Sequence, residues 1–527
     1  MKSVLRSASL AFALTTLYLL NLTGPLISPE HDLAFHFPAA ASILFLPVLI
    51  DIALLFLVLT AVLLAAARNR RVQLVVWSIL LLPIPAILLS TIASFSGKRV
   101  PQPLTLAFAF LPILALLFIA VRLRHLIPRF RRLRPAVESI FAFIAVSGLI
   151  IVAELLWFNY QARNNNAPPV LHVSTVSQPA PNRIIWLLLD ELSYDQLYEH
   201  RYPGLQLPAF DRLAAQSSLL THVEPANEFT RVAVPSLLTG EILEDTRQSS
   251  DGLHLGLKDD ETAQWSRLDP ANTVFADALA AHYSTSAVGW YEPYCRIFPS
   301  VLDHCFWIYG DDIPGGISAR RTTSANVVAS FQTLGRHVLE NLHLGRTSED
   351  QDQALRDVHG HRADYQALLT AGDAALADPS STFLYLHMPI PHPFGFYDRR
   401  THSFPDHQTS YLDNLALADE YLAHVRQILE KQAQWDNATV IVMGDHSWRT
   451  SFVWSVSPHW TPEEDLASHH ANYDERPAYL IKLPHQQTPT RIGHRFEASH
   501  TRPLIKALLT HQLQTPADLT DWIDSQQ

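Results

Sequence analysis

Acidic and histidine side chains follow three apolar, strand-like segments in the second half of the chain. These segments cover residues 183–189, 382–386 and 439–443, and the side chains that follow them are Asp190, Glu191, His387, His392, Asp445 and His446. In open α/β sheets, ligands bind beyond the carboxyl ends of the strands, so three strand ends would deliver these groups to one edge. Carboxylate oxygens and neutral imidazole nitrogens on rigid elements suit a divalent cation. The spacing predicts a metal site, although Asp and His also favour loops without any ligand.

Five short apolar runs are the elements that would position these side chains. They cover residues 183–189, 285–289, 382–386, 439–443 and 478–483. Runs that are apolar on both faces are typical of central strands covered by helices. Apolar side chains recur at helical spacing between two of these runs, at Leu412, Leu415, Ala418, Leu422, Val425 and Leu429. This alternation predicts an α/β domain with a doubly wound, mostly parallel sheet.

The first 160 residues differ from the rest in charge and composition. The 527 residues carry a net charge of -11, but residues 1–160 hold 13 basic and 5 acidic residues, which leaves −19 for the remainder. The remainder also holds 23 of the 26 histidines. An acidic domain repels phosphate backbones, so the composition argues against a nucleic-acid partner.

Five apolar stretches in the first 160 residues are each near or above the ~20 residues that a membrane-spanning helix needs. They cover residues 8–27, 39–66, 72–96, 104–121 and 137–158. The first has Lys2 and Arg6 ahead of it, as a signal peptide would, but four more stretches follow, so we interpret it as an uncleaved helix. Arginine-rich loops place the N-terminus in the cytoplasm by the positive-inside rule. An odd number of spans then puts everything after Tyr160 outside.

The sequence therefore predicts three parts. Residues 1–160 form a five-helix transmembrane domain, the Asn- and Pro-rich residues 161–181 form a linker, and residues 182–527 form an exported domain. Asp51 and Glu154 lie within or near apolar spans. We expect these two acids to face another helix or the interface rather than a transport path.

The two cysteines of the chain, Cys295 and Cys305, both fall in the exported part. Exported domains meet an oxidising environment, in which a pair this close in sequence is expected to form a disulfide. The alternative is a pair of unlinked structural thiols.

Five segments of the second half resemble, in order, the alkaline phosphatase/sulfatase superfamily. They are PNRIIWLLLDELSYDQL, FTRVAVPSLLTG, LHMPIPHPF, VIVMGDHSWR and ERPAYLIKLP. The resemblance covers most of residues 182–500. It implies a metal-dependent hydrolase or transferase with a nucleophile at the start of a helix.

The resemblance places Thr230 in the nucleophile position. Arylsulfatases carry a Cys or Ser there, followed by x-Pro-x-Arg, and convert it to formylglycine. This chain has Val232 and Val234 where the Pro and Arg would stand, so it cannot be matured in that way. A Thr nucleophile in this setting resembles phosphoethanolamine transferases and lipoteichoic acid synthases, which also combine five membrane helices with an exported catalytic domain.

The resemblance further implies roles for individual side chains. It implies metal ligands at Glu191, Thr230, Asp445 and His446, with Asp190 a further candidate, and substrate-binding histidines at His392 and His459. His469 and His470 compete with His459, His387 is expected to pack at its strand end, and Arg449 is either a phosphate contact or a surface arginine. A histidine ligand favours Zn²⁺ or Mn²⁺ over Ca²⁺, which prefers oxygen ligands.

The leading hypothesis is a membrane-anchored, metal-dependent phosphotransferase or phosphodiesterase. It would act on membrane lipid head groups or envelope glycans from the bacterial cytoplasmic (inner) membrane, with its catalytic domain on the periplasmic or extracellular side. One alternative is a sulfatase-like hydrolase of sulfate or phosphate esters that works without formylglycine. Another is a non-catalytic pseudoenzyme that binds an envelope polymer. A binding protein of this kind would not need a nucleophile, so Thr230 argues against this alternative.

Overall fold

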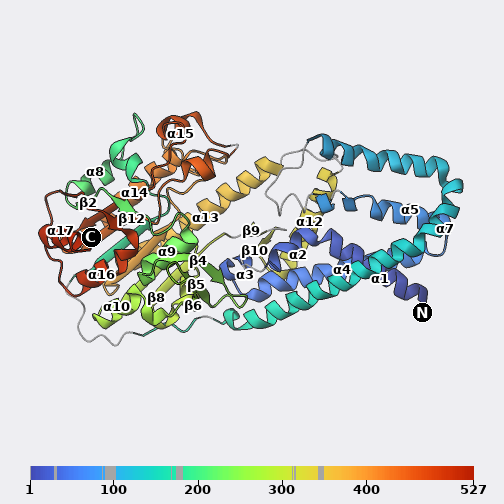
Figure 1. The fold of residues 1–527 in the computed structure, drawn as a ribbon, viewed down its shortest axis with the longest axis horizontal. Coiled ribbons are helices and arrows are strands. Elements are labelled where there is room, and N and C mark those ends of the chain that lie inside the picture. Colours follow the sequence, from blue (N-terminus) through green and yellow to red (C-terminus); the bar gives the residue numbers. More distant parts are fainter. Residues whose placement is uncertain are drawn as a thin grey trace. The chain divides into compact units, whose positions relative to one another are not determined.

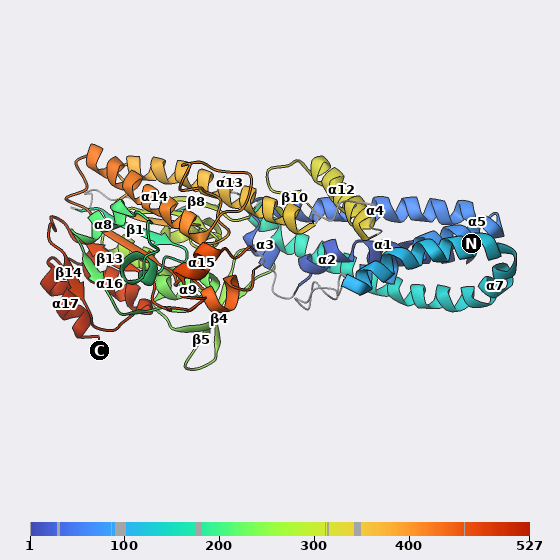
Figure 2. The ribbon, with the colours of Figure 1, turned by 90° about the horizontal axis from the view of Figure 1, so that it is seen from above.

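The computed structural model divides into two compact units, shown as ribbons in Figures 1 and 2. It describes residues 2–28, 32–85, 87–89, 102–167, 169–173, 182–310, 312–313, 316–341, 349–457 and 459–526. The first unit combines Met1–Ala167 with Asp311–Asp350, and the second combines Pro168–Gly310 with Gln351–Gln527. Residues 311–350 fall within the range that the sequence assigned to the exported domain, yet they pack with the N-terminal helices.

The first unit is helical. Its elements are α1 (Lys2–Tyr18), α2 (Leu20–Leu26), α3 (Asp32–His36), α4 (Ala41–Ala66), α5 (Arg70–Leu81), α7 (Gln102–Gln161), β9 (Asp312–Ile313), β10 (Ile317–Ser318) and α12 (Thr323–Asn341). Helix α1 packs against α4 and α7. Apolar side chains from these three helices, among them Leu14, Leu63 and Phe141, form one buried cluster.

The structure corrects the prediction of five membrane spans. Among the described residues, Ala41–Ala66 and Arg132–Asn164 are long and apolar enough to cross a membrane, and Val4–Tyr18 with Leu20–Leu26 makes a third if this pair, bent by 69°, is one span. In the stretch 72–96, helix α5 ends at Leu81, shortly before Pro83 and Pro85, and much of the remainder lies outside the described residues. The stretch 104–121 is continuous with 137–158 in the 60-residue helix α7, rather than separated from it by a loop. Two or three apolar helices support membrane anchoring.

The second unit contains an eight-stranded mixed sheet of order β14-β2-β13-β12-β1-β11-β7-β8. Its strands are β1 (Ile184–Leu189), β2 (Ser218–Leu220), β7 (Thr285–Trp290), β8 (His304–Ile308), β11 (Phe383–Met388), β12 (Thr439–Gly444), β13 (Tyr479–Lys482) and β14 (Thr490–Ile492). Strand β1 pairs in parallel with β11 and β12, and β7 pairs in parallel with β11 and β8. Strand β13 is antiparallel to both β12 and β2. All five strands predicted from apolar runs are therefore present.

Helices cover both faces of this sheet. The helices are α8 (Pro208–Ala214), α9 (Thr230–Thr239), α10 (Val274–Ala280), α11 (Tyr294–Ile297), α13 (Glu349–Ala377), α14 (Tyr411–Lys431), α15 (Pro462–Ala467), α16 (Thr501–Leu509) and α17 (Pro516–Asp524). Figure 2 shows α13 and α14 along one side of the sheet and α9 and α16 along the other. Alternate residues of β1, namely Ile185, Leu187 and Leu189, share a buried cluster with the apolar stripe of α14. A capping box between Ser410 and Asp413 fixes the start of α14.

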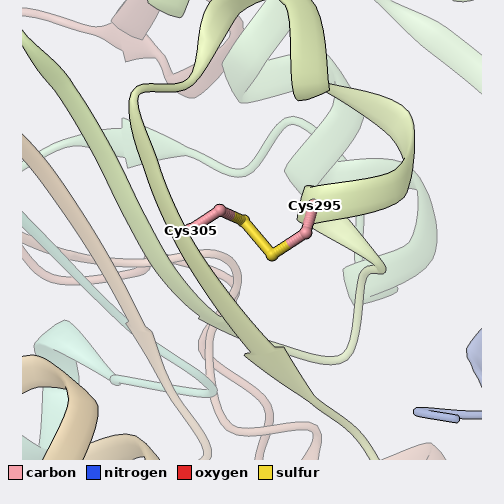
Figure 3. The surroundings of a disulfide bond; sticks show 2 residues. All are labelled: Cys295 and Cys305. Atoms are coloured by element: carbon pink, nitrogen blue, oxygen red, sulfur yellow. A yellow bond between two sulfur atoms is a disulfide. The ribbon is translucent and has the colours of Figure 1, made fainter. Parts of the chain in front are cut away.

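Smaller elements complete the second unit. Two short sheets lie outside the main one and comprise β4 (Leu243–Gln248), β5 (Leu255–Asp259) and β6 (Trp265–Arg267), and β3 (Val223–Glu224) with β15 (Phe496–Glu497). A disulfide joins Cys295, in the short helix α11, to Cys305, in β8 (Figure 3). Their Cα atoms are 5.5 Å apart, which is within the usual range for a disulfide.

Candidate active site

Three neighbouring parallel strands deliver the acidic and imidazole groups. Asp190 and Glu191 follow β1 directly, and Asp445 and His446 follow β12. His387 lies within β11, one residue before its end. Because β1 lies between β11 and β12 in register, the carboxyl ends of all three strands meet at one edge. The arrangement follows the general rule for ligand sites in α/β sheets.

The backbone turns sharply where these side chains leave the strands. Glu191 has a φ of 64°, a left-handed conformation that is uncommon for a residue with a side chain. Its N–H donates to Asp445 Oδ1 at 3.1 Å, and its carbonyl accepts from Tyr411 Oη at 2.8 Å. A Cβ at Gly444 would lie 2.7 Å from the Leu192 carbonyl oxygen, so this position requires glycine. Backbone strain of this kind is concentrated at functional sites.

The carboxylates are buried together with unpartnered oxygens. Asp190, Glu191 and Asp445 are fully buried, and Asp190 Oδ1 and Asp445 Oδ2 have no hydrogen-bond partner among the described residues. Burial raises the pKa of Asp190 well above its usual value, and the nearby charges of Asp445 and Glu191 raise this pKa further. Burial also raises the pKa of Asp445. A cluster of buried anions with free oxygens is costly unless a cation neutralises it.

Two fully buried histidines complete the cluster in their neutral form. Burial lowers the pKa of His446 and of His387 to about 4. The Nδ1–H of His446 donates to the Ser447 carbonyl at 3.0 Å, because a carbonyl can only accept, and this leaves the Nε2 lone pair free. His387 Nδ1 contacts Tyr294 Oη at 2.8 Å, while its Nε2 lies 3.9 Å from Asp190 Oδ2. Both rings therefore offer Nε2 toward the carboxylates.

Thr230 lies at the first position of α9, within reach of this cluster. Its Oγ1 is 3.1 Å from His446 Nε2 and 3.4 Å from Asp190 Oδ2. Residue Gly240 ends the helix with a φ of 72°, and its N–H donates to the Ser236 carbonyl. At the start of a helix, backbone N–H groups and the positive end of the dipole favour an anion. The hydroxyl of Thr230 is thus placed between two proton acceptors and an anion-binding helix end.

Arg449 and Trp454 hold the carboxylate of Glu191. Arg449 Nε donates to Glu191 Oε1 at 2.7 Å, and its Nη2 forms an ion pair with the same oxygen. Trp454 Nε1 donates to Glu191 Oε2 at 2.8 Å. Arg449 is buried, so it is not the surface arginine that was one of its two expected roles.

A wall of rings borders the cluster next to Glu191. His392 Nε2 lies 3.5 Å from Arg449 Nη2 and 3.9 Å from Glu191 Oε1. The rings of Trp290, His361 and Trp454 lie 5.3 to 5.7 Å from that of His392. Burial lowers the pKa of His392 well below its usual value, and that of His361 to about 4, so both rings are neutral at neutral pH.

The three other histidines proposed from the sequence lie elsewhere. The ring of His459 is 6.3 Å from that of Phe394, and no described hydrogen bond joins it to the carboxylate cluster. His469 packs edge-on against His200, and His470 forms an ion pair with Asp465. Of the histidines proposed to bind substrate, His392 is therefore the one that lies beside Glu191, whereas the described contacts of His469 and His470 are with other residues.

A cavity of about 460 Å³ opens beside the start of α9. Phe229 and Arg231, the two neighbours of Thr230, contribute to its lining. Four glutamates also line it, namely Glu224, Glu228, Glu244 and Glu475. The cavity therefore lies next to the helix end that carries Thr230, and its lining is rich in carboxylates.

Several groups around the site carried little or no signal in the sequence. His361 comes from α13 and Trp290 from the end of β7, and neither lies in a segment with metal-ligand spacing. His387 was expected to pack at its strand end, and it is buried there, but its Nε2 also faces Asp190. Its place at the end of a predicted strand, like that of Asp190 and Asp445, was the one signal available for it.

The donor set fits a divalent cation. Two overlapping groups have one ligand atom per residue within 4.8 Å of one another: Asp190, Glu191 and His446, and Asp190, His387 and Asp445. Each group combines carboxylate oxygens with one imidazole nitrogen, as Zn²⁺ and Mn²⁺ sites do. The unpartnered atoms Asp190 Oδ1, Asp445 Oδ2 and His387 Nε2 belong to the second group. Chemically, such a cluster can activate a hydroxyl and stabilise a transferred anionic group.

Comparison with known proteins agrees with this geometry. A family model described as Sulfatase matches residues 182–484, which is more than half of the chain and includes every residue of the cluster. No curated protein matches the sequence.

Several solved structures match this chain at low sequence identity. Ps i-CgsB in complex with k-i-k-neocarrahexaose is 17% identical and covers 65% of this chain and 74% of its own, with a TM-score of 0.40. The phosphonate monoester hydrolase of Agrobacterium radiobacter is 13% identical, with coverages of 63% and 74% and a TM-score of 0.39. The lipoteichoic acid synthase LtaP of Listeria monocytogenes is 15% identical, with coverages of 66% and 78% and a TM-score of 0.35. At these identities and TM-scores, the three structures bear on neither substrate nor mechanism.

Proposed function

The chain belongs to the sulfatase family, and we propose that it is a membrane-anchored, metal-dependent enzyme that transfers or hydrolyses phosphodiesters through Thr230. The observation that carries this proposal is the position of the Thr230 hydroxyl, 3.1 Å from His446 Nε2 and 3.4 Å from Asp190 Oδ2. Formylglycine chemistry requires Cys or Ser at this position, so sulfate ester cleavage by that route is closed to the chain. Phosphoryl transfer by an unmodified hydroxyl remains open.

The reaction divides into two displacements at phosphorus. The Thr230 oxygen attacks the phosphodiester, its proton passes to a neighbouring acceptor, and the bond to the leaving alcohol breaks. The phosphorus, still bonded to the second alcohol of the substrate, is then held as a diester of Thr230. An acceptor alcohol or water attacks this ester in the second step, and the Thr230 oxygen leaves and regains a proton. The helix N-terminus at Thr230 favours the negative oxygens of the phosphoryl group throughout.

Glu191, Asp445, His446 and Thr230, with Asp190, are the residues that we propose to hold a divalent cation. Such a cation, when bound, lowers the pKa of the hydroxyl and offsets the developing negative charge. His387 Nε2 faces Asp190 and Asp445 and is a further candidate ligand. The imidazole donors favour Zn²⁺ or Mn²⁺ over Ca²⁺.

His392 and Arg449 would bind the substrate beside this centre. Arg449 is fixed by Glu191 and lies 3.5 Å from His392 Nε2, so one guanidinium and one neutral imidazole border the same space. Such a pair can donate hydrogen bonds to phosphate oxygens. His459 lies farther along the same wall, next to Phe394, and is proposed to contact the more distant part of the substrate.

We further propose that the substrates are membrane lipid head groups or envelope glycans. The apolar helices Ala41–Ala66 and Arg132–Asn164 would hold the enzyme in the bacterial cytoplasmic (inner) membrane, with the catalytic unit on the periplasmic or extracellular side. Anchoring an enzyme in the membrane that contains its substrate raises the effective substrate concentration. The high negative charge after Tyr160 disfavours a nucleic-acid substrate.

The proposal can be tested with two model substrates on the purified full-length protein. We expect a chromogenic aryl phosphodiester to be turned over and an aryl sulfate to be turned over far more slowly. Thr230→Ala should lower phosphodiester turnover by about 10⁴-fold or more, because it removes the nucleophilic hydroxyl. Thr230→Ser should retain part of the turnover, because serine keeps a hydroxyl at this position. Thr221→Ala, at a partly buried threonine outside the carboxylate cluster, is the matched control.

Two results would contradict the proposal. If Thr230→Ala turned over the diester as fast as the wild type, Thr230 would not be the nucleophile. If the aryl sulfate were the better substrate, the alternative of a sulfate ester hydrolase without formylglycine would be correct.

A further inference from the structure

Residues Asp311–Asp350 leave the catalytic unit and pack with the N-terminal helices. In sequence they lie between β8 and α13, both of which belong to the second unit, yet in space they belong to the first. The chain therefore passes between the two units at three places: after Ala167, after Gly310 and after Asp350. We call residues 316–341 of this excursion, which include β10 and α12, the docking segment.

Apolar contacts join the docking segment to the membrane-type helices. Ile317 is fully buried in one cluster with Leu44, Val48 and Ile52 of α4. Leu334 of α12 packs against the same cluster. Since α4 is the most apolar helix among the described residues that are long enough to span a membrane, the docking segment is attached to a membrane element rather than to a surface loop.

A buried polar contact fixes the position of α12 on α4. Asp51 of α4 is 1% exposed, and its Oδ2 accepts a hydrogen bond from the Ser330 hydroxyl of α12. Ser330 is itself buried, and 279 positions separate the two residues. A buried carboxylate needs a donor, and a polar partner at one position selects a single alignment of two packed helices. The acid that the sequence placed inside an apolar span thus has its partner in the second half of the chain.

The chain leaves the catalytic unit for this excursion at Gly310, next to the wall of the candidate site. Asp364 of α13 accepts hydrogen bonds through Oδ2 from the Gly310 N–H at 2.9 Å and from Trp290 Nε1 at 3.1 Å. Gly310 is the last residue before the excursion, and α13 is the first helix after it. Trp290 lies 5.4 Å, ring to ring, from His392. One carboxylate therefore ties the start of the excursion to the helix that follows it, at the border of the site.

We propose that the docking segment is a second attachment between the catalytic unit and the membrane helices, independent of the linker at residues 161–181. The surface of α4 around Asp51 is the binding surface, and its partner is α12 of the same chain. On either side of the docking segment, the chain continues into the catalytic unit at Gly310 and at α13, the helix that carries Asp364.

The proposal predicts the behaviour of a chain that is cut only in the linker. A site for a specific protease is inserted between residues 173 and 182 of the full-length protein, and membranes that carry the protein are treated with that protease and sedimented. We expect the fragment that begins after the cut to remain with the membranes. If the linker were the only attachment, this fragment would appear in the supernatant, and that result would overturn the proposal.

A variant pair shows whether the docking segment is what retains the fragment. Ser330→Arg combined with Leu334→Arg places two cations in the apolar contact, so most of the cut fragment should move to the supernatant, whereas the uncut variant should sediment like the wild type. Gln332→Arg adds the same side chain to an exposed position of α12 and is the matched control, with retention equal to that of the wild type. If the cut double variant stayed with the membranes, some other contact would be responsible and the proposal would fail.

Two further measurements separate undocking from misfolding and from any failure of the proposed function. Asp51→Leu alters the other side of the contact and leaves the catalytic half unchanged in sequence, and it should also release part of the cut fragment. The released fragments should give the same protease-resistant core as the wild type, because the disulfide and the sheet are untouched. All these readouts follow where a fragment sediments, so they stand whatever reaction the enzyme performs.

Discussion

The two units of the molecule bury carboxylates in opposite ways. In the helical unit, Asp51 is a single acid in apolar surroundings with one neutral donor, the Ser330 hydroxyl. In the catalytic unit, Asp190, Glu191 and Asp445 are buried together at the ends of parallel strands, next to the imidazoles of His387 and His446. One arrangement buries a single acid with a donor to one of its two oxygens, whereas the other collects three acids in one place.

The difference distinguishes an acid that serves helix packing from acids that serve a reaction. A lone buried acid with a hydroxyl partner can serve packing alone. Several buried acids repel one another, which destabilises the folded state unless a bound cation offsets the charge. Such grouped acids are typical of functional sites. Asp51, Asp190 and Asp445 each have an oxygen without a partner among the described residues, but of these three only the catalytic acids are grouped with one another and with imidazoles. The contrast leads to four expectations, in which changes to the catalytic cluster have large effects and changes at Asp51 have small ones.

The largest effect is expected at Asp445. Asp445→Asn removes a charged ligand while conserving shape, so diester turnover should fall by at least about 10³-fold and bound metal should be lost. Asp51→Asn, the same chemical change in the helical unit, should leave turnover within about twofold of the wild type. Steady-state kinetics and elemental analysis of the purified proteins measure both. Equal losses in the two variants would remove the distinction between the two kinds of acid.

The next effect concerns stability on metal addition. A ligand that binds only the folded state stabilises it by about 2.7 kcal/mol at a concentration 100 times its dissociation constant. Adding Zn²⁺ or Mn²⁺ to chelator-treated protein should therefore raise the unfolding temperature of the wild type and of Asp51→Asn, but not that of Asp445→Asn. Thermal unfolding in detergent checks this. A shift that persisted in Asp445→Asn would place the metal elsewhere.

A pH-dependent effect should follow from Asp190 in the metal-free protein. Its pKa is raised above the unfolded value of 3.8 by burial and by neighbouring charge, so the folded state binds the proton more tightly than the unfolded state does. This contribution is fully present below about pH 4 and is lost as the pH rises through the folded pKa. The free energy of unfolding of the wild type, relative to that of Asp190→Asn, should therefore decrease as the pH rises.

The comparison of the wild type with Asp190→Asn cancels the contribution of the histidines to the free energy of unfolding, which changes with pH in the opposite direction. His387 and His446, whose folded pKa is about 4 against 6.5 unfolded, lose their contribution as the pH falls, and they are present in both proteins. Urea titrations in chelator at pH 5 and pH 8 measure the difference. A relative stability of the wild type that increased with pH would contradict the assignment of Asp190.

The smallest effect is expected at Ser330. Ser330→Ala removes the donor to Asp51, and hydrogen bonds of this kind between apolar helices contribute about 0.6 kcal/mol on average and rarely exceed 2 kcal/mol. The Ser330 hydroxyl also lies 2.9 Å from the Val327 carbonyl oxygen, so only part of its bonding is specific to Asp51. Denaturation of the full chain in detergent should show a small loss, with diester turnover unchanged. A large loss of turnover would mean that this contact affects the reaction directly.

The central strands and the acids at their ends could be predicted from the sequence because both signals are local. The runs at 183–189, 382–386 and 439–443 are apolar on both faces, and Asp190, Glu191, Asp445 and His446 follow two of them directly. The structure places these four residues together with Thr230. The capped amphipathic helix at Tyr411–Lys431 gave an equally local signal.

Groups that reach the site from a distance could not be predicted in this way. Arg449 could be a surface residue on its sequence alone, and only the fold brings it to Glu191. Trp290 and His361 join the wall through β7 and α13, which no spacing rule connects. The docking of α12 on α4 depends on a contact across 279 positions. The number of membrane spans was overpredicted because hydropathy alone does not register the prolines after α5 or the continuity of α7.

The most direct test of the central claim is a search for the phosphorylated nucleophile. The full-length enzyme is mixed with a phosphodiester, quenched in acid during turnover, digested and analysed by mass spectrometry. In the wild type, we predict that the peptide containing Thr230 carries the phosphorus together with the alcohol retained from the substrate, and that the corresponding peptide of Thr230→Ala carries neither. Rapid turnover with Thr230 unmodified throughout, or undiminished turnover by Thr230→Ala, would contradict the account.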